Sequence, residues 1–328
     1  MSHHVLLCRD LHPAGRALLE ARADITLTTL HDPPPPQFHA ALKDADAVLC
    51  WLERMDQAAL DAAPKLRVCA RYGVGFDSVD VPACTARGVA VMVANGSNDL
   101  SVAEHAMMLM LAIARRAVQF DARVKSGGWW PEDLGKGGKL AMADLAGRSV
   151  LVVGYGRIGT RVARLCQAFG MRVLVLDPAY TPARLAADGM VPARGLHAAL
   201  AECDVVTLHC PLRPETRHLL DAAAFAAMKP GTVLVNTARG PVVDEAALAD
   251  ALRAGRVMGY GSDVLEVEPP PRDHPLFGLP NVILSPHLAA STEEGLARMA
   301  RIAAQNILDV LDGRPDPAMM VNPGLLGA

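Results

Sequence analysis

A segment with three spaced glycines near the middle of the chain constrains the fold most. Residues 149–159 read SVLVVGYGRIG, an apolar strand that runs through Gly154, Gly156 and Gly159 into a helix. Gly154 permits a tight turn, Gly156 lets the backbone approach a pyrophosphate, and Gly159 lets the helix pack on the strand. Free N–H groups at a helix N-terminus favour an anion. The segment therefore predicts the first βαβ unit of a dinucleotide-binding domain.

An acidic residue at the end of the next expected strand supports this interpretation. Asp177 follows Gly159 by 18 residues, which places a carboxylate where it accepts hydrogen bonds from the adenosine ribose. Its charge should repel a 2′-phosphate, so NAD is favoured over NADP. The alternative is that Asp177 and Pro178 only form a turn. Gly73 and Gly75 lack a third glycine at the required spacing and predict no second fingerprint.

Strand-like and helix-like segments alternate along the chain, which predicts doubly wound parallel sheets. The 328 residues, 51% of them hydrophobic, suffice for two domains with aliphatic cores. The expected strands are 5–8, 47–51, 66–71, 89–93, 149–153, 172–176, 205–209, 232–236, 258–262 and 282–285. The expected helices are 13–23, 38–44, 56–63, 101–116, 158–168 and 292–311.

Two connections and the ends of one helix are predicted in more detail. Residues 31–36, which contain four consecutive prolines, suggest a polyproline II segment. A capping box at 101–104 predicts the start of the helix 101–116, whose last turn would carry Arg115 and Arg116. The glycine-rich stretch 127–138 predicts a loop.

Composition excludes several classes of function. A net charge of −3 provides no electrostatic footprint for nucleic acid or an anionic membrane. The longest apolar run, 106–114, is far shorter than the roughly 20 residues of a membrane span. Seven cysteines without a CxxC pair disfavour a disulfide framework or a structural zinc site. With no signal peptide at the N-terminus, we expect a soluble, reduced, cytoplasmic protein.

Three polar residues follow expected strands of the cofactor-binding sheet, at the edge where such sheets bind ligands. They are Arg239, Glu268 and His287. Hydride transfer to a carbonyl needs a proton donor, which histidine can be near neutral pH. A nearby carboxylate would orient the imidazole, and a guanidinium can bind a carboxylate and polarise a carbonyl. The alternative is that the three are solvated loop residues.

With these motifs the chain resembles the D-2-hydroxyacid dehydrogenase family, which is D-isomer-specific and NAD-dependent. The resemblance covers nearly the whole chain. It rests on the segments 73–77 (GVGFD), 101–105 (SVAEH), 154–159 (GYGRIG), 211–216 (PLRPET), 236–240 (NTARG), 263–269 (DVLEVEP) and 285–287 (SPH).

The resemblance implies residue roles. Arg239 would bind the 2-oxo acid, and Glu268 would pair with His287, the general acid/base. Asp263 would hold the nicotinamide carboxamide. The expected cofactor-binding residues are Gly154, Tyr155, Gly156, Arg157, Ile158, Gly159, Asp177, His209, Cys210, Pro211, Thr216, Thr237, Ala238, Asp263 and His287. The expected substrate-binding residues are Trp51, Gly73, Val74, Gly75 and Arg239.

For His209, a buried histidine with satisfied hydrogen bonds is an equal alternative, and His105 is expected to be structural. No metal is expected, because nicotinamide carries the hydride chemistry.

The resemblance also implies a domain plan. Residues 1–99 and 290–328 would form a discontinuous substrate domain with a Rossmann-like fold, and 100–289 the inserted Rossmann domain that binds NAD, with the active site in the cleft. A homodimer is expected, with the apolar helix 101–116 in its interface. Trp129 and Trp130 either anchor their loop or reach the partner subunit.

The substrate is less constrained than the cofactor. In the phosphoglycerate dehydrogenase branch a basic residue stands where this chain has Cys50, which argues against a phosphorylated substrate. The end of the chain at Ala328 leaves no room for that branch's regulatory domain. Trp51 suggests a short or apolar substrate side chain, although a core aromatic is as plausible. Two alternative functions remain open: a phosphite-type dehydrogenase, and an NAD(H)-sensing, corepressor-like binding protein.

Overall fold

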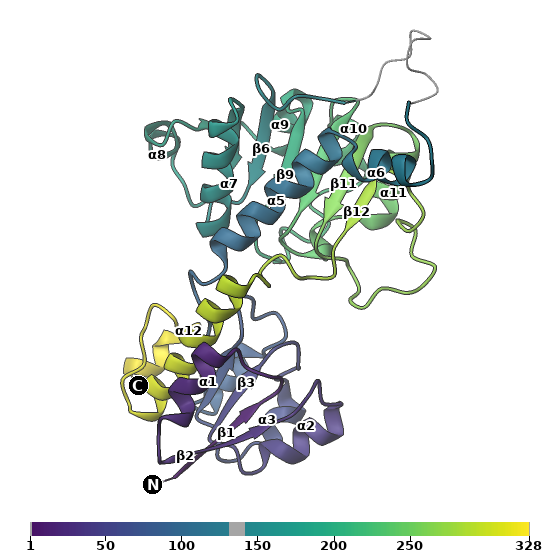
Figure 1. The fold of residues 1–328 in the computed structure, drawn as a ribbon. Coiled ribbons are helices and arrows are strands. Elements are labelled where there is room, and N and C mark those ends of the chain that lie inside the picture. The colour runs from purple at the N-terminus through teal and green to yellow at the C-terminus, as the bar shows by residue number, and fades with distance from the viewer. Residues whose placement is uncertain (1, 131–141, 328) are drawn as a thin grey trace. The chain divides into compact units, whose positions relative to one another are not determined.

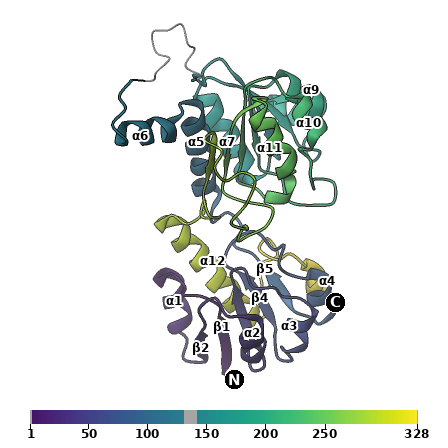
Figure 2. The same cartoon turned by 90° about the vertical axis from the view of Figure 1, so that its right-hand side faces the viewer.

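The computed structural model describes residues 2–130 and 142–327, and the chain forms two compact units. The first comprises Met1–Asn98 with Ala290–Ala328, and the second comprises Asp99–Ala289. Each unit is an all-parallel sheet covered by helices on both faces (Figures 1 and 2). The predicted α/β class is therefore confirmed. Part of the predicted loop 127–138 lies outside the described residues.

The first unit has a five-stranded sheet in the order β2-β1-β3-β4-β5. The order reverses between β1 and β3, so a switch point lies at the carboxyl ends of these two strands, where ligands bind in such sheets. The strands are β1 (His3–Leu7), β2 (Ile25–Thr29), β3 (Ala47–Cys50), β4 (Val68–Arg71) and β5 (Ala90–Met92).

Helices cover both faces of this sheet because its strands are apolar on both sides. Leu19, Met299 and Ile307, from the first and last helices, pack in one apolar core, and Phe38, Leu60 and Cys84 pack in the other. The helices are α1 (Pro13–Glu20) and α12 (Glu293–Leu311) on one face, and α2 (Pro35–Leu42), α3 (Gln57–Asp61) and α4 (Val81–Ala86) on the other. The short 3₁₀ helix η2 spans Pro323–Gly327.

The second unit has a seven-stranded sheet in the order β12-β11-β10-β9-β6-β7-β8. Its switch point lies between β6 and β9, on either side of which the chain order runs in opposite directions. The strands are β6 (Ser149–Val153), β7 (Arg172–Leu176), β8 (Val191–Pro192), β9 (Val205–Leu208), β10 (Thr232–Asn236), β11 (Val257–Ser262) and β12 (Val282–Leu284).

The helices of the second unit divide between two apolar cores. Leu109, Val162 and Leu185 belong to one core, and Leu200, Phe225 and Leu248 belong to the other. The first face carries α5 (Asp99–Ala114), α7 (Arg157–Ala168) and α8 (Pro182–Ala187), and the second carries α9 (Leu196–Glu202), α10 (Ala222–Ala227) and α11 (Glu245–Arg253) (Figures 1 and 2). The helix α6 (Ala117–Lys125) follows α5, and the 3₁₀ helix η1 spans Gly240–Val242.

Several predicted boundaries are wrong for identifiable reasons. α2 begins at Pro35, inside the predicted polyproline segment, because proline fits the first helical turn, where no N–H is needed. α5 begins at the buried Asp99 rather than at a capping box on Ser101. It ends at Ala114, so the two arginines that follow are not in its last turn, and Arg116 has a left-handed φ of 51°.

All seven cysteines are buried in the structure and have free thiols. Burial raises the pKa of Cys166 and of Cys203 to about 12, as expected for small apolar core residues. Among the described helices, none is long and apolar enough to cross a bilayer.

Candidate active site at the carboxyl edge of the second sheet

The candidate residues of the second unit follow the carboxyl ends of neighbouring strands. His287 follows β12, Asp263 follows β11 and Arg239 follows β10, all on one side of the switch point. Gly154 follows β6 and Asp177 follows β7, on the other side. Adjacent strands lie about 4.8 Å apart, so residues that follow neighbouring strands lie close together. After the roles predicted from the sequence, we call the side with Gly154 and Asp177 the cofactor half and the side with Arg239, Asp263 and His287 the chemical half.

The glycine-rich turn requires the absence of side chains at two positions. Gly154 has a φ of 91°, and a Cβ there would lie 2.6 Å from the Cys210 backbone nitrogen. A Cβ at Gly159 would lie 2.0 Å from the Gly154 carbonyl oxygen. A Cβ at Gly156 would instead meet no described atom within 4 Å. Gly156 is the N-cap of α7, and no side chain caps this helix, which leaves its N–H groups available to an anion.

Asp177 connects the end of β7 to this turn. One carboxylate oxygen accepts the Tyr155 N–H at 2.6 Å, and the other accepts the Ala179 N–H at 2.8 Å. The second bond forms the turn that the sequence left as an alternative, while the first places the carboxylate beside the glycines. Each oxygen keeps a further lone pair for a ribose hydroxyl.

The other motif residues near the glycines have structural contacts of their own. The Tyr155 side chain is buried and packs edge-on against Tyr180, so its contribution to the site is its backbone N–H. Arg157 donates to the buried Asp99 at 3.2 Å, and Ile158 packs against the core.

Two buried polar atoms, in the residues that directly follow β9 and β10, have no hydrogen-bond partner within the part of the chain that the structure describes. They are Nδ1 of His209 and Oγ1 of Thr237. Burial lowers the pKa of His209 to about 3, so the ring is neutral, and its Nε2 pairs with the Thr207 hydroxyl at 2.8 Å. Unsatisfied buried polar groups are costly, and a bound ligand would satisfy them. The alternative for His209, a buried histidine whose ring nitrogens are both hydrogen-bonded within the protein, is therefore not supported.

The residues after β9 form a turn held by a threonine. The Thr216 hydroxyl donates to the Pro211 carbonyl at 2.7 Å and accepts the Arg213 N–H at 2.8 Å. Cys210 is buried directly against Gly154. The backbone at the start of this segment therefore lies directly against the glycine-rich turn.

The structure brings His287 and Glu268 together. Nδ1 of His287 lies 2.6 Å from a carboxylate oxygen of Glu268, whose other oxygen accepts the Leu265 N–H at 2.9 Å. Burial raises the pKa of the Glu268 carboxyl, but the hydrogen bond and charge of His287, with help from Leu265 and Arg239, lower it below its ordinary value overall. The carboxylate form thus persists across neutral pH, and Nε2 of His287 remains to exchange a proton.

The Arg239 side chain is fixed next to its own backbone. Its Nη1 donates to the Ala238 carbonyl at 2.6 Å, and the Asn236 side chain accepts from Ala238 N–H and donates to the Arg239 carbonyl. The buried Asn236 thus ties the turn that carries the guanidinium.

The carboxylate of Asp263 holds the His287 loop. One oxygen accepts the Ser285 hydroxyl at 2.6 Å and the Leu288 N–H at 2.9 Å, and the other accepts the Ala289 N–H at 2.8 Å. His105 pairs with the same Ser285 hydroxyl at 2.8 Å. This contact agrees with the structural role expected for His105, and it gives Asp263 a structural task that the motif alone did not indicate.

In the first unit, the predicted substrate residues lie at its own sheet edge. Trp51, directly after β3, packs edge-on against Tyr72 with ring centroids 5.2 Å apart. The guanidinium of Arg9, two residues after the end of β1, lies 4.3 Å above the Trp51 ring. This pair marks the switch point of the first sheet. Sequence reasoning missed Arg9, although its place just after the first strand was a usable signal.

The loop Gly73–Gly75 is held from both ends. The Gly73 carbonyl accepts the Ala94 N–H at 2.8 Å, and the Gly75 carbonyl accepts Nε of the buried Arg71 at 2.8 Å. Gly73 has a φ of 152°, a conformation that favours glycine. Because the carbonyls are occupied in this way, the loop is fixed in one conformation.

Comparison with known proteins assigns the chain. The family model described as "D-isomer specific 2-hydroxyacid dehydrogenase, NAD binding domain" matches residues 107–289. The chain belongs to this family. It is therefore an NAD-dependent oxidoreductase that interconverts 2-hydroxy acids and 2-oxo acids, as the sequence predicted.

Individual relatives cover almost the whole chain. A glyoxylate reductase of Thermofilum pendens is 36% identical over 96% of this chain and 94% of its own. A D-3-phosphoglycerate dehydrogenase of Mycobacterium tuberculosis is 41% identical over 98% of this chain but only 60% of its own. The solved structure of a D-lactate dehydrogenase from Aquifex aeolicus, complexed with NAD and lactic acid, has a TM-score of 0.85 at 29% identity, covering 97% and 98%.

Proposed function

We propose that this dehydrogenase reduces a 2-oxo acid, and oxidises the corresponding D-2-hydroxy acid, with His287 as general acid/base, Glu268 as its partner and Arg239 as the substrate-binding cation. The observation that carries the proposal is the 2.6 Å contact between His287 and Glu268 at the strand edge that also holds Arg239. NAD(H), when bound, accepts or supplies the hydride. Side chains of this chain carry out the remaining steps of the reaction.

In reduction, the substrate oxygen gains negative charge and must receive a proton. The Arg239 guanidinium polarises the carbonyl and stabilises this charge. Nε2 of His287 donates the proton, because Nδ1 is engaged by Glu268. The carboxylate of Glu268 orients the imidazole and balances its positive charge. In oxidation the same groups act in reverse, and Nε2 takes the hydroxyl proton.

We propose that NAD binds along the cofactor half of the same edge. The uncapped N-terminus of α7 would hold the pyrophosphate, and Asp177 the adenosine ribose. The unpartnered Thr237 hydroxyl and Nδ1 of His209 would contact the cofactor. The remaining predicted contacts are Tyr155, Arg157, Ile158, Cys210, Pro211, Thr216, Ala238 and Asp263. Asp263 would reach the carboxamide in addition to its loop contacts.

The first unit would bind the rest of the substrate. Backbone N–H groups of Val74 and Gly75, in the loop fixed by Arg71, would bind its carboxylate. Trp51 would contact its side chain, since the ring is partly exposed at the switch point of that sheet. A short or apolar 2-oxo acid, such as one related to glyoxylate or hydroxypyruvate, fits an aromatic contact better than a phosphorylated one.

A panel of 2-oxo acids with NADH, followed by loss of nicotinamide absorbance, tests the proposal. Glyoxylate, hydroxypyruvate, pyruvate and longer apolar 2-oxo acids should be reduced, and every product with a stereocentre at C2 should have the D configuration. Phosphite with NAD is the control for the alternative chemistry. NADH binding without turnover of any member of the panel would instead favour a corepressor-like sensor.

Asp177→Ala should reduce the preference for NAD over NADP by roughly tenfold, which corresponds to about 1.4 kcal/mol. The carboxylate accepts from ribose hydroxyls and repels a 2′-phosphate. Asp177→Asn serves as the matched variant, because its amide oxygen can still accept the Tyr155 N–H. Dissociation constants for both nucleotides measure the effect. An unchanged preference in both variants would remove Asp177 from the ribose site.

We propose a cytoplasmic homodimer. Large apolar side chains of the second unit are exposed in the single chain, and free thiols suit a reducing compartment. Met108 lies on α5, the helix expected in the dimer interface, and is 45% exposed in the single chain, which fits that expectation. The exposed side chains are Leu100, Met108, Val118, Val124, Trp129 and Trp130. Sedimentation of the purified protein measures the oligomeric state.

A further inference from the structure

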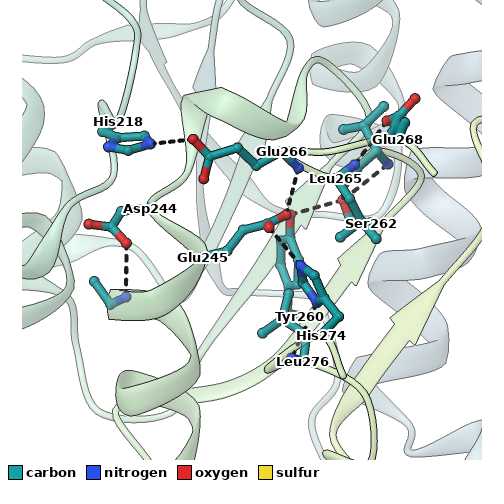
Figure 3. A network of polar contacts seen from close by, with 12 residues as sticks. His218, Asp244, Glu245, Tyr260, Ser262, Leu265, Glu266, Glu268, His274 and Leu276 are labelled. Carbon is teal, nitrogen blue, oxygen red and sulfur yellow. Dashed lines mark hydrogen bonds and ion pairs between the residues drawn. The ribbon is translucent and has the colours of Figure 1, made fainter. Parts of the chain in front are cut away.

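A buried carboxylate that the reaction does not use lies behind the loop that carries Glu268. Glu245 is the first residue of α11 and is only 6% exposed. One of its oxygens accepts the Glu266 N–H at 2.9 Å, and the other lies 2.8 Å from Nε2 of His274 (Figure 3). Both oxygens therefore hold the segment that follows β11.

The ring of His274 has a defined orientation. It is 7% exposed, and its Nδ1 accepts the Leu276 N–H at 3.4 Å. Because Nδ1 is an acceptor, Nε2 carries the hydrogen and donates to Glu245. The Glu245 carboxylate is thus fixed from one side by His274 and used on the other side to hold Glu266.

The peptide that Glu245 holds lies directly against the substrate-binding turn. A Cβ at Gly240, the residue after Arg239, would lie 1.9 Å from the Leu265 carbonyl carbon and 2.3 Å from the Glu266 nitrogen. Only glycine allows this approach. The backbone of the Arg239 turn therefore packs directly against the Leu265–Glu266 peptide.

The same peptide also orients Glu268. The Leu265 N–H donates to one Glu268 oxygen at 2.9 Å, and the other oxygen contacts His287 at 2.6 Å. On the outer side, the Glu266 carboxylate pairs with Nε2 of His218 at 2.9 Å (Figure 3). It also pairs with Arg217 at 3.1 Å. The loop is thus held from its buried side by Glu245 and from its surface side by His218 and Arg217.

We propose that Glu245, oriented by His274, is a positioning residue that holds Glu268 in the geometry needed to support His287. The inference rests on the proposed function of Glu268 and His287. Glu245 is separated from the reacting atoms by the Leu265–Glu266 peptide, so it acts only through that backbone. Since a displacement of about 1 Å can cost 10²-fold in rate, such a support affects turnover without touching substrate.

The test compares Glu245→Ala, Glu245→Gln and Glu268→Gln in the complete enzyme. Glu245→Ala should lower kcat by about 10- to 100-fold, with the KM for the 2-oxo acid changed by no more than about twofold, because Arg239 is retained. Glu245→Gln should restore part of the rate, since its amide oxygen can still accept the Glu266 N–H. If the alanine variant does not fold, the nearly isosteric glutamine variant carries the test.

The double variant Glu245→Ala/Glu268→Gln separates positioning from general destabilisation. If Glu245 acts through Glu268, the double variant should match Glu268→Gln alone within about twofold. In the enzyme without cofactor, hydrogen exchange at the Glu266 amide should accelerate in Glu245→Ala but not in Glu268→Gln. Asp250→Asn is the control, since this exposed residue of the same helix should affect none of these measurements.

Three results would overturn the inference, and they differ in what they mean for the proposed function. If Glu268→Gln lowers kcat but the Glu245 variants do not, or if the two losses multiply in the double variant, the positioning role fails and the proposed function stands. If Glu268→Gln itself leaves kcat unchanged, the assigned role of Glu268 fails as well.

Discussion

We expect His287→Ala to lower kcat for 2-oxo acid reduction by about 10²- to 10⁴-fold, the span of a lost general acid. The reason is that Nε2 of His287 is the proton donor, while Nδ1 is engaged by Glu268 at 2.6 Å. The dissociation constant for NADH should stay within about twofold, because the other cofactor contacts that we assign, among them the N-terminus of α7 and Asp177, are retained. Steady-state kinetics and fluorescence titration of NADH measure the two quantities.

The control is His197→Ala, which removes an exposed histidine from the same unit and should leave kcat unchanged. Thermal unfolding of both variants shows whether the fold survives, which we expect because the His287 side chain is 43% exposed. Turnover near that of the unmodified enzyme in His287→Ala would remove this residue from the reaction.

Arg239→Gln should lower kcat/KM for the 2-oxo acid by about 10²- to 10³-fold, the loss found when a donor to a developing oxyanion is removed. The guanidinium serves both the carbonyl and the substrate's charge, so KM should rise while kcat falls. Arg239→Lys should restore little, because an ammonium lacks the planar fork that binds a carboxylate through two hydrogen bonds.

Arg253→Gln is the matched control for Arg239, since it removes an exposed arginine whose contacts among the described residues are with Asp250 and the Pro275 carbonyl. It should change kcat/KM by less than about twofold. If Arg239→Gln behaved like this control, the substrate-binding cation would have to be sought elsewhere, and Arg9 would be the first candidate.

Much of the fold could be predicted because apolar strands and spaced glycines are local signals. The strand β2 was missed because Thr26, Thr28 and Thr29 interrupt its apolar pattern. The start of α5 was misplaced because Asp99 was not recognised as a helix residue, although its buried carboxylate pairs with Arg157 and Arg161 of α7. Such a pairing depends on packing between helices, which a local pattern does not contain.

The residues of the candidate site also fall into those that local sequence patterns reveal and those that depend on tertiary contacts. Gly154, Asp177, Arg239 and His287 each stand beside a strand end, so their shared edge could be predicted. Glu245 and His274 could not, because 29 residues separate them and neither belongs to a recognised motif. The roles of residues that support other residues depend on tertiary contacts, and the sequence alone does not reveal them.

The discontinuous first unit has a consequence for how the protein is made. Its apolar core includes Met299, Ala303 and Ile307 of α12, which the ribosome adds only after the complete second unit. During translation, the N-terminal segment therefore emerges first but lacks one face of its core until synthesis is nearly finished. The inserted unit can fold earlier, as a continuous stretch. A nascent chain stalled before α12 should expose the sheet face that this helix covers, and chaperones would bind there.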